Sequence, residues 1–147
     1  MKSVKDIKLL YEEYFESVKR VQRSRGAFEG ILGFGKKLSN EPCHFEFQKK
    51  LKDYLDEIKS DMPESETLKE ILSFIYCIHR EQKSEPSIYW MLIAVHMDTL
   101  ELIEGLSSKD ADELLKLYGR LFKKHERLPA QNKLYDKLKT RSEAGRD

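Results

Sequence analysis

The 147-residue sequence predicts an all-α protein, a compact bundle of five to six helices with a central helix over Ile88–Glu104. Apolar residues recur along most of the chain at spacings of three and four, which is typical of helices buried on one face. No segment alternates apolar and polar residues as a half-buried β-strand would. No unit of 20 to 50 residues repeats, so the pattern indicates a bundle and not a repeat array.

The first helix is expected to begin at Val4 and to continue to Val21. Ser3 and Asp6 form an aspartate variant of the capping box, in which each side chain satisfies a backbone N–H at the helix start. The apolar stripe that follows is wide enough for packing inside a multi-helix bundle. Its members are Val4, Ile7, Leu10, Tyr11, Tyr14, Phe15, Val18 and Val21.

A glycine-rich segment separates the first two helices. Residues 26–37 hold four of the seven glycines, which predicts a tightly turning, packed connector. Asn40 and Pro42 then suit the first turn of a second helix that ends between Ser60 and Pro63. The expected inner face of this helix is Phe47, Leu51, Tyr54, Leu55 and Ile58.

The third and fourth helices contain the most apolar part of the chain. The third is expected to begin near Ser65 or Thr67 and to bury Leu68, Ile71, Leu72, Ile75 and Ile78. The fourth, Ile88–Glu104, is apolar on all sides over its first ten residues, which is typical of a helix surrounded by others. Gly105 is a candidate carboxy-terminal cap for it.

Two shorter helices complete the prediction. Ser107 and Asp110 start the fifth, and Pro129 in a first-turn position starts the sixth. One domain over residues 1–141 is expected, followed by a flexible tail over 142–147. The inward residues are Leu114, Leu117, Tyr118, Leu121 and Phe122 in the fifth helix and Leu134, Tyr135 and Leu138 in the sixth.

Composition favours a soluble cytoplasmic protein. The longest apolar run, Ile88–Met97, is well short of the roughly 18 residues that a membrane-spanning helix needs. An acid at Asp6 does not suit a secretory signal, and Cys43 and Cys77 are too few for a disulfide framework. We therefore expect a cytoplasmic location, reduced thiols, no membrane association, and a monomer or homodimer.

Three histidines are candidate metal ligands. In an up-and-down bundle His44, His79 and His125 fall toward the same end, so a site for a divalent transition metal is geometrically open, with Glu41 as a neighbouring carboxylate. Their placement also suits structural roles, since a cation near a helix carboxy-terminus is favoured by the dipole. No cofactor is expected beyond this metal alternative.

His96 lies inside the predicted central helix and is expected to be buried. A buried neutral imidazole needs a hydrogen-bond partner, and most such residues are core histidines. A catalytic base there would need a cleft and a carboxylate on the same helix face, which Glu101 does not supply.

A glutamate cluster resembles part of a known signature. Glu12, Glu13 and Glu16 are similar to the opening Glu-Glu-x-x-Glu of MazG-type nucleotide pyrophosphohydrolases, which implies Mg²⁺ held by carboxylates. The second element of that signature, Glu-x-x-Asp, is absent, and Asp53 and Asp56 are the nearest substitute. The same glutamates also suit a solvated helix face.

Charge is distributed unevenly although the net charge is only +1. Residues 114–141 carry nine basic and two acidic side chains, a net +7, and the rest of the chain carries −6. This basic element can dock onto the acidic body of the protein or bind an acidic protein partner. Nucleic acid is disfavoured, because the pI is near 7.7 and no binding motif is present. The candidate partner-binding residues are Arg120, Lys123, Lys124, Arg127, Lys133 and Lys137.

These patterns predict a non-enzymatic domain that binds a protein partner or another ligand. No complete catalytic motif is present beside a well-specified helical core. The alternative is a helical enzyme that binds a metal or a small molecule, with its site at the histidine-bearing end of the bundle or beside His96.

Overall fold

A computed structural model describes residues 3–32, 42–82, 92 and 96–145 of the chain. In these ranges the chain forms α-helices and two 3₁₀-helices and no strand, which confirms the all-α prediction. The helices are α1 (Val4–Leu32), α2 (Pro42–Asp61), α3 (Ser65–Glu81), η3 (Met97–Gly105), α5 (Ser108–Leu121), η4 (Lys124–Glu126) and α6 (Pro129–Glu143).

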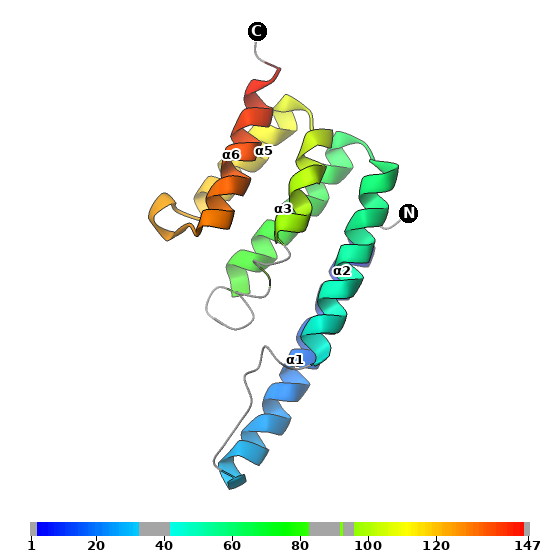
Figure 1. Cartoon of the computed structure of the whole chain (residues 1–147), viewed down its shortest axis with the longest axis vertical. Helices are drawn as coiled ribbons and strands as arrows, with labels where there is room; N and C mark the ends of the chain where they lie inside the picture. Colours follow the sequence, from blue (N-terminus) through cyan, green and yellow to red (C-terminus); the bar gives the residue numbers. More distant parts are fainter. Residues whose placement is uncertain (1–2, 33–41, 83–91, 93–95, 146–147) are drawn as a thin grey trace.

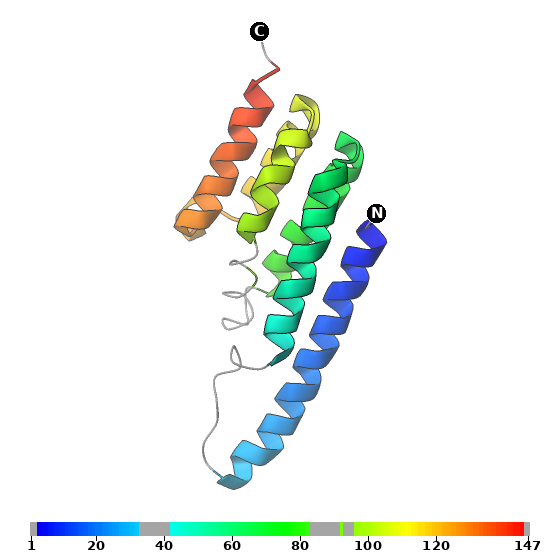
Figure 2. The same ribbon diagram turned by 45° about the vertical axis from the view of Figure 1, so that its right-hand side comes forward.

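The helices form three antiparallel pairs stacked in two layers. Successive helices pack as α1 with α2, α3 with η3, and α5 with α6. Figure 1 looks onto a layer of α2, η3 and α6, and the layer of α1, α3 and α5 lies behind it. Figure 2 shows the same row of helices from the side of α1. Each layer therefore consists of helices that run in the same direction.

The expected starts of α1, α5 and α6 are confirmed, whereas Asn40 of the expected second start lies outside the described residues. At the start of α1 the Ser3 N–H donates to Asp6 Oδ2 at 2.8 Å, and the Asp6 N–H reaches Ser3 Oγ at 3.4 Å, which completes the capping box. Ser107 caps α5 by accepting from the Asp110 N–H at 3.1 Å. Pro129 begins α6, where its missing N–H costs no helical hydrogen bond.

The glycine-rich connector begins later than predicted. The helix α1 continues through Gly26 and Gly30 to Leu32, and in Figures 1 and 2 this end extends beyond the other helices. A glycine inside a helix costs only about 1 kcal/mol, so two of them do not end a helix that its other residues favour. Residues 33–37 of the predicted connector lie outside the described residues.

The core follows the predicted stripes closely. Every predicted inward residue from Val4 to Val18 is buried except Phe15, which is half-buried, as are Val21, Tyr54, Ile78, Leu117, Leu121 and Tyr135. Several buried residues were not predicted, among them Tyr76, Thr99 and Gln131. Gln131 is polar but satisfied, because its Oε1 accepts the Leu128 N–H at 2.8 Å.

η3, which covers the end of the predicted central helix, lies at the centre of the fold as predicted but is not an α-helix. η3 contacts α2, α3 and α6, and it buries Thr99, Leu102 and Ile103. It is a 3₁₀-helix over Met97–Gly105 and not the end of an α-helix. Thr99 Oγ1 donates to the His96 carbonyl at 2.6 Å, an oxygen that the N–H of residue 100 would take in an α-helix. Residues 88–91 and 93–95 of the predicted helix lie outside the described residues.

The tail predicted over residues 142–147 overlaps the end of α6. α6 continues through Glu143, and Ser142 is buried with its hydroxyl donating to the Lys139 carbonyl at 2.8 Å. Close by, Arg141 Nε donates to the Leu106 carbonyl at 2.7 Å. The Arg141 contact joins the last turn of α6 to the end of η3.

Gly105 is needed for close packing and not as the predicted helix cap. Its backbone is outside the left-handed region, and a Cβ there would lie 2.6 Å from both Leu68 Cδ1 and Met62 Sδ. We expect Gly105→Ala to lower the free energy of unfolding by about 1–3 kcal/mol, because Leu68 is buried and must move.

Gly119→Ala is the matched control for this prediction. A Cβ at Gly119 would meet only Tyr135 Cε2, at an ordinary 3.7 Å. Because alanine restricts the unfolded chain more than glycine does, Gly119→Ala should raise the free energy of unfolding by about 0.5–1 kcal/mol. Urea unfolding of the two variants measures both effects. Equal stabilities for the two variants would contradict the close packing at Gly105.

Candidate functional site

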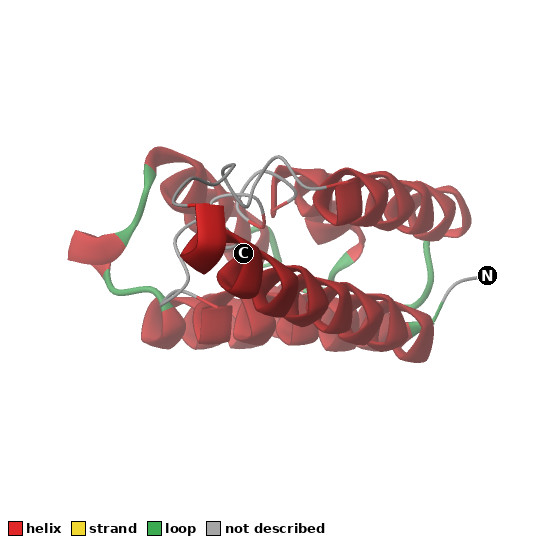
Figure 3. Ribbon diagram, turned by 90° about the horizontal axis from the view of Figure 1, so that it is seen from below, coloured by secondary structure: helices red, strands yellow, loops and turns green. Residues whose placement is uncertain are grey.

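Exposed basic side chains surround the turn between α5 and α6. Arg120 comes from the last turn of α5, Lys123 and Lys124 from the turn, and Lys133 from the start of α6, and all four are exposed. In Figures 1 and 3 this turn, with the short helix η4, stands away from the bundle. We call Arg120, Lys123, Lys124 and Lys133 the basic tip.

The basic tip has no internal charge compensation. None of its four side chains forms an ion pair with a described residue, and the only acid between Arg120 and Lys133 is Glu126. Like charges held together at a projecting turn repel one another and attract an anionic surface. This arrangement is chemically suited to electrostatic recognition.

Two of the six residues predicted for partner binding have internal roles instead. The Arg127 guanidinium lies 3.9 Å from the centre of the Tyr135 ring, and its Nε donates to the Phe122 carbonyl at 2.9 Å. Lys137 Nζ lies 3.3 Å from Glu104 Oε1 at the end of η3. Arg127 therefore shapes the turn, and Lys137 joins α6 to η3. Such contacts were predicted by the alternative in which the basic element packs onto the acidic body of the protein itself.

The three histidines predicted as metal ligands do not come together. His44 and His79 are buried, whereas the side chain of His125 is 81% exposed on η4. Among the described residues, no group of three or more His, Cys, Asp or Glu side chains is arranged to hold a metal ion. The proposed cluster is wrong because two of these histidines face the core, where tyrosines hold them.

Those tyrosines come from one face of α1. Tyr14 and His44 Nδ1 share a hydrogen bond of 2.8 Å, and Tyr11 and His79 Nε2 share one of 3.1 Å. Tyr11 and Tyr14 are one helical turn apart, so α1 engages α2 and α3 through equivalent phenol–imidazole contacts. These bonds satisfy polar atoms inside the core and fix the spacing of three helices.

His96 is buried as predicted, but it lacks the hydrogen bonds expected of a core histidine. Its ring stacks on His79 with centroids 4.2 Å apart and meets the edge of Tyr76. Neither ring nitrogen of His96 has a hydrogen-bond partner in the described part of the protein. Burial lowers the pKa of His96 to about 3, and burial together with the neighbouring His96 lowers the pKa of His79 well below its usual value.

These pKa values define what the buried imidazoles can do. Both rings stay neutral at physiological pH, since protonation would bury an uncompensated charge. A base with a pKa near 3 is poorly matched to proton abstraction at neutral pH, where a value near the working pH is best. The stacked histidines are therefore structural groups that make the core sensitive to acid.

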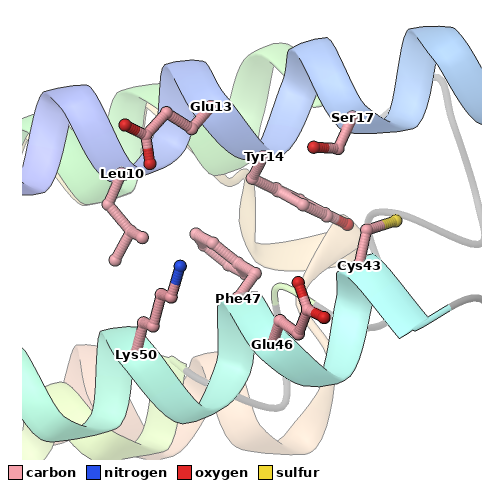
Figure 4. A pocket seen from close by; sticks show the side chains of 8 residues that line it. All are labelled: Leu10, Glu13, Tyr14, Ser17, Cys43, Glu46, Phe47 and Lys50. Atoms are coloured by element: carbon pink, nitrogen blue, oxygen red, sulfur yellow. The ribbon is translucent and has the colours of Figure 1, made fainter.

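Two of the hollows in the surface lie beside α1. Between α1 and α2 a small cleft of about 100 Å³ lies over the stacked rings of Tyr14 and Phe47, with Glu13, Glu46 and Lys50 at its edge (Figure 4). This is smaller than the roughly 300–1,000 Å³ of most ligand sites. A groove of about 710 Å³ runs between α1, α3 and α5.

Sequence reasoning did not identify the larger groove. Its half-buried apolar members are Phe74, Cys77 and Leu117, and the buried core residue Leu114 also lines it. The available signal was Phe74, a large apolar residue outside the predicted stripe of its helix.

The glutamates that resemble a pyrophosphohydrolase signature lie on the outer surface of the first helix pair. Glu12, Glu13 and Glu16 are exposed on α1, and Asp53 and Asp56 are exposed on α2. No family model, curated protein or solved structure matches this chain. The resemblance extends no further than these side chains, which the structure presents as a solvated face.

None of the described helices combines the length and the apolar character that crossing a membrane requires.

Proposed function

We propose that this chain is a cytoplasmic, non-enzymatic binding domain that takes an acidic protein partner through the basic tip. The observation that carries the proposal is the exposure of four cationic side chains, without ion-pair partners among the described residues, on a projecting turn. Charges arranged in this way accelerate the encounter with a complementary surface and select against basic partners.

The electrostatic balance of the whole chain favours a protein partner over nucleic acid. The net charge is +1 and the pI is about 7.7, and the excess of basic over acidic side chains falls within residues 114–141. Nucleic-acid binding depends on neutralising many phosphates along a backbone, which a small basic tip does poorly. A cytoplasmic location is supported by Cys43 and Cys77, neither of which forms a disulfide with a described residue.

The test compares two charge-reversal variants of equal charge. The triple variant K123E/K124E/K133E reverses the basic tip and spares Arg127, whose contacts with Tyr135 and Phe122 are structural. The control K19E/K49E/K52E reverses three exposed lysines on α1 and α2. Fluorescence anisotropy measures the affinity of each for a labelled 20-residue polyglutamate peptide.

We expect the tip variant to bind polyglutamate at least about tenfold more weakly. Each of the three exposed lysines contributes about 0.5 kcal/mol or more of binding free energy, and each glutamate that replaces one repels the peptide. The control variant should bind within about threefold of the parent protein because only its net charge differs. Equal losses in the two variants would contradict the assignment to the tip. Tighter binding to a DNA duplex of equal charge would contradict a protein partner.

A further inference from the structure

The groove between α1, α3 and α5 has an apolar floor that reaches the basic tip. The floor consists of Phe74 and Cys77 of α3 and Leu114 and Leu117 of α5. Arg120 lines the same groove, and it is also a member of the basic tip. A single partner can therefore contact the apolar floor and the exposed cations together.

Charges divide this groove along its length. Toward the amino-terminal ends of α3 and α5, Lys69 is neutralised by Glu113 at 2.7 Å and Asp110 at 3.4 Å. Exposed Glu66 and Glu70 lie at the amino-terminal end of α3. This end of the groove is acidic.

The opposite end of the groove is basic. Lys8 Nζ lies 5.6 Å from the centre of the Phe74 ring, and it enters from α1. Arg120 enters from the last turn of α5. The Ser65–Asp110 hydrogen bond and the contact of Tyr76 with Tyr118 show that α3 and α5 run parallel, so Arg120 lies at the Cys77 end.

The shape and chemistry of the walls indicate the secondary structure of the occupant. All three walls are helices, so they offer no strand edge with which an extended peptide could pair. A helix satisfies its own backbone and needs only apolar side chains at spacings of three and four to fill such a groove.

We infer that the groove binds an amphipathic helix of the acidic partner, with the apolar face of that helix on Phe74, Cys77 and Leu117 and its acidic end beside Lys8 and Arg120. This inference rests on the proposed function and names the part of the partner that the site takes. Burial of a few leucine side chains supplies affinity, and the charges fix which end of the helix meets the basic tip.

The experiment uses two acidic peptides of equal charge. One is polyglutamate, and the other is a longer amphipathic helix with leucines on one face and glutamates clustered at one end. A trifluoromethyl label on Cys77, in a Cys43→Ser background, reports on the groove by ¹⁹F NMR. We expect the amphipathic helix to bind at least tenfold more tightly than polyglutamate and to shift the Cys77 resonance, which polyglutamate should leave in place.

Two variants of α5 separate groove contact from general stability. Leu117→Ser removes an apolar group from the floor, and Leu115→Ser removes an equally half-buried leucine outside the groove. In unlabelled protein, only Leu117→Ser should lose the tighter binding of the amphipathic helix.

Each remaining outcome would overturn the inference. Equal affinities for the two peptides with an unmoved Cys77 resonance would leave the basic tip as the binding site and remove the groove. Failure of both peptides to bind would remove the proposed function as well. A Cys77 shift that grows with protein concentration alone would assign the groove to a second copy of this chain.

Discussion

Lowering the pH from 7 to 5 is expected to reduce the free energy of unfolding by about 2 kcal/mol through His96 alone, with a further loss from His79. Both imidazoles are buried and neutral in the folded protein. In the unfolded chain they have ordinary pKa values near 6.5 and take up protons as the pH falls. No described cation or carboxylate contacts the stacked rings to offset this effect.

The direction of the pH dependence follows from the number of protons bound. Below pH 6.5 the unfolded state binds more protons than the folded state. The free energy of unfolding therefore decreases as the pH is lowered, until the pH reaches the folded-state pKa, which is about 3 for His96. Most carboxylates titrate below pH 5, and the hydrogen bond from Ser65 together with Lys69 lowers the pKa of Asp110 further. The range between pH 6.5 and 5 therefore isolates the histidines.

Urea unfolding at pH 7, 6 and 5 measures this dependence. His96→Leu should flatten the dependence of the free energy of unfolding on pH because it removes one of the two stacked, buried imidazoles, and a melting curve at pH 7 checks that this variant folds. His125→Ala should keep the parental slope, since its side chain is exposed. A parental slope in His96→Leu would show that buried His96 does not control the acid response.

Leu102→Ala is expected to lower the free energy of unfolding by about 2–5 kcal/mol, because it opens a cavity in the segment that three helices surround. Leu102 is only 1% exposed, and its neighbour Ile103 is fully buried. A loss of this size is a large fraction of the roughly 5–15 kcal/mol that stabilises a typical domain.

Leu9→Ala provides the control for this loss. Leu9 is 53% exposed on the outer face of α1, so the same chemical change there should alter stability by less than about 0.5 kcal/mol. Thermal and urea unfolding of both variants give the comparison. Similar effects at the two positions would contradict a central role for η3.

Helix positions and inner faces were predictable because local patterns determine them. The capping box at Ser3 and Asp6 and the apolar spacing after it predict where α1 begins and which face it buries. The continuation of α1 through Gly26 and Gly30 was not predicted, because glycine propensity is a weak effect that neighbouring residues override.

The candidate site was predictable only in part, because its details depend on contacts between distant residues. The excess of basic residues after Leu114 is visible in the sequence. The pairing of Lys137 with Glu104 depends on how α6 packs on η3. The stacking of His79 on His96 likewise joins two helices whose register no local pattern specifies.

The most direct test of the central claim is to map where an acidic chain binds. Backbone ¹H–¹⁵N spectra recorded during titration with polyglutamate report each amide separately. We predict that the largest shift changes fall between Arg120 and Lys133 and weaken as salt is added, since screening reduces exposed charge interactions. Shift changes that are as large along α2 as at the basic tip would contradict the proposed function.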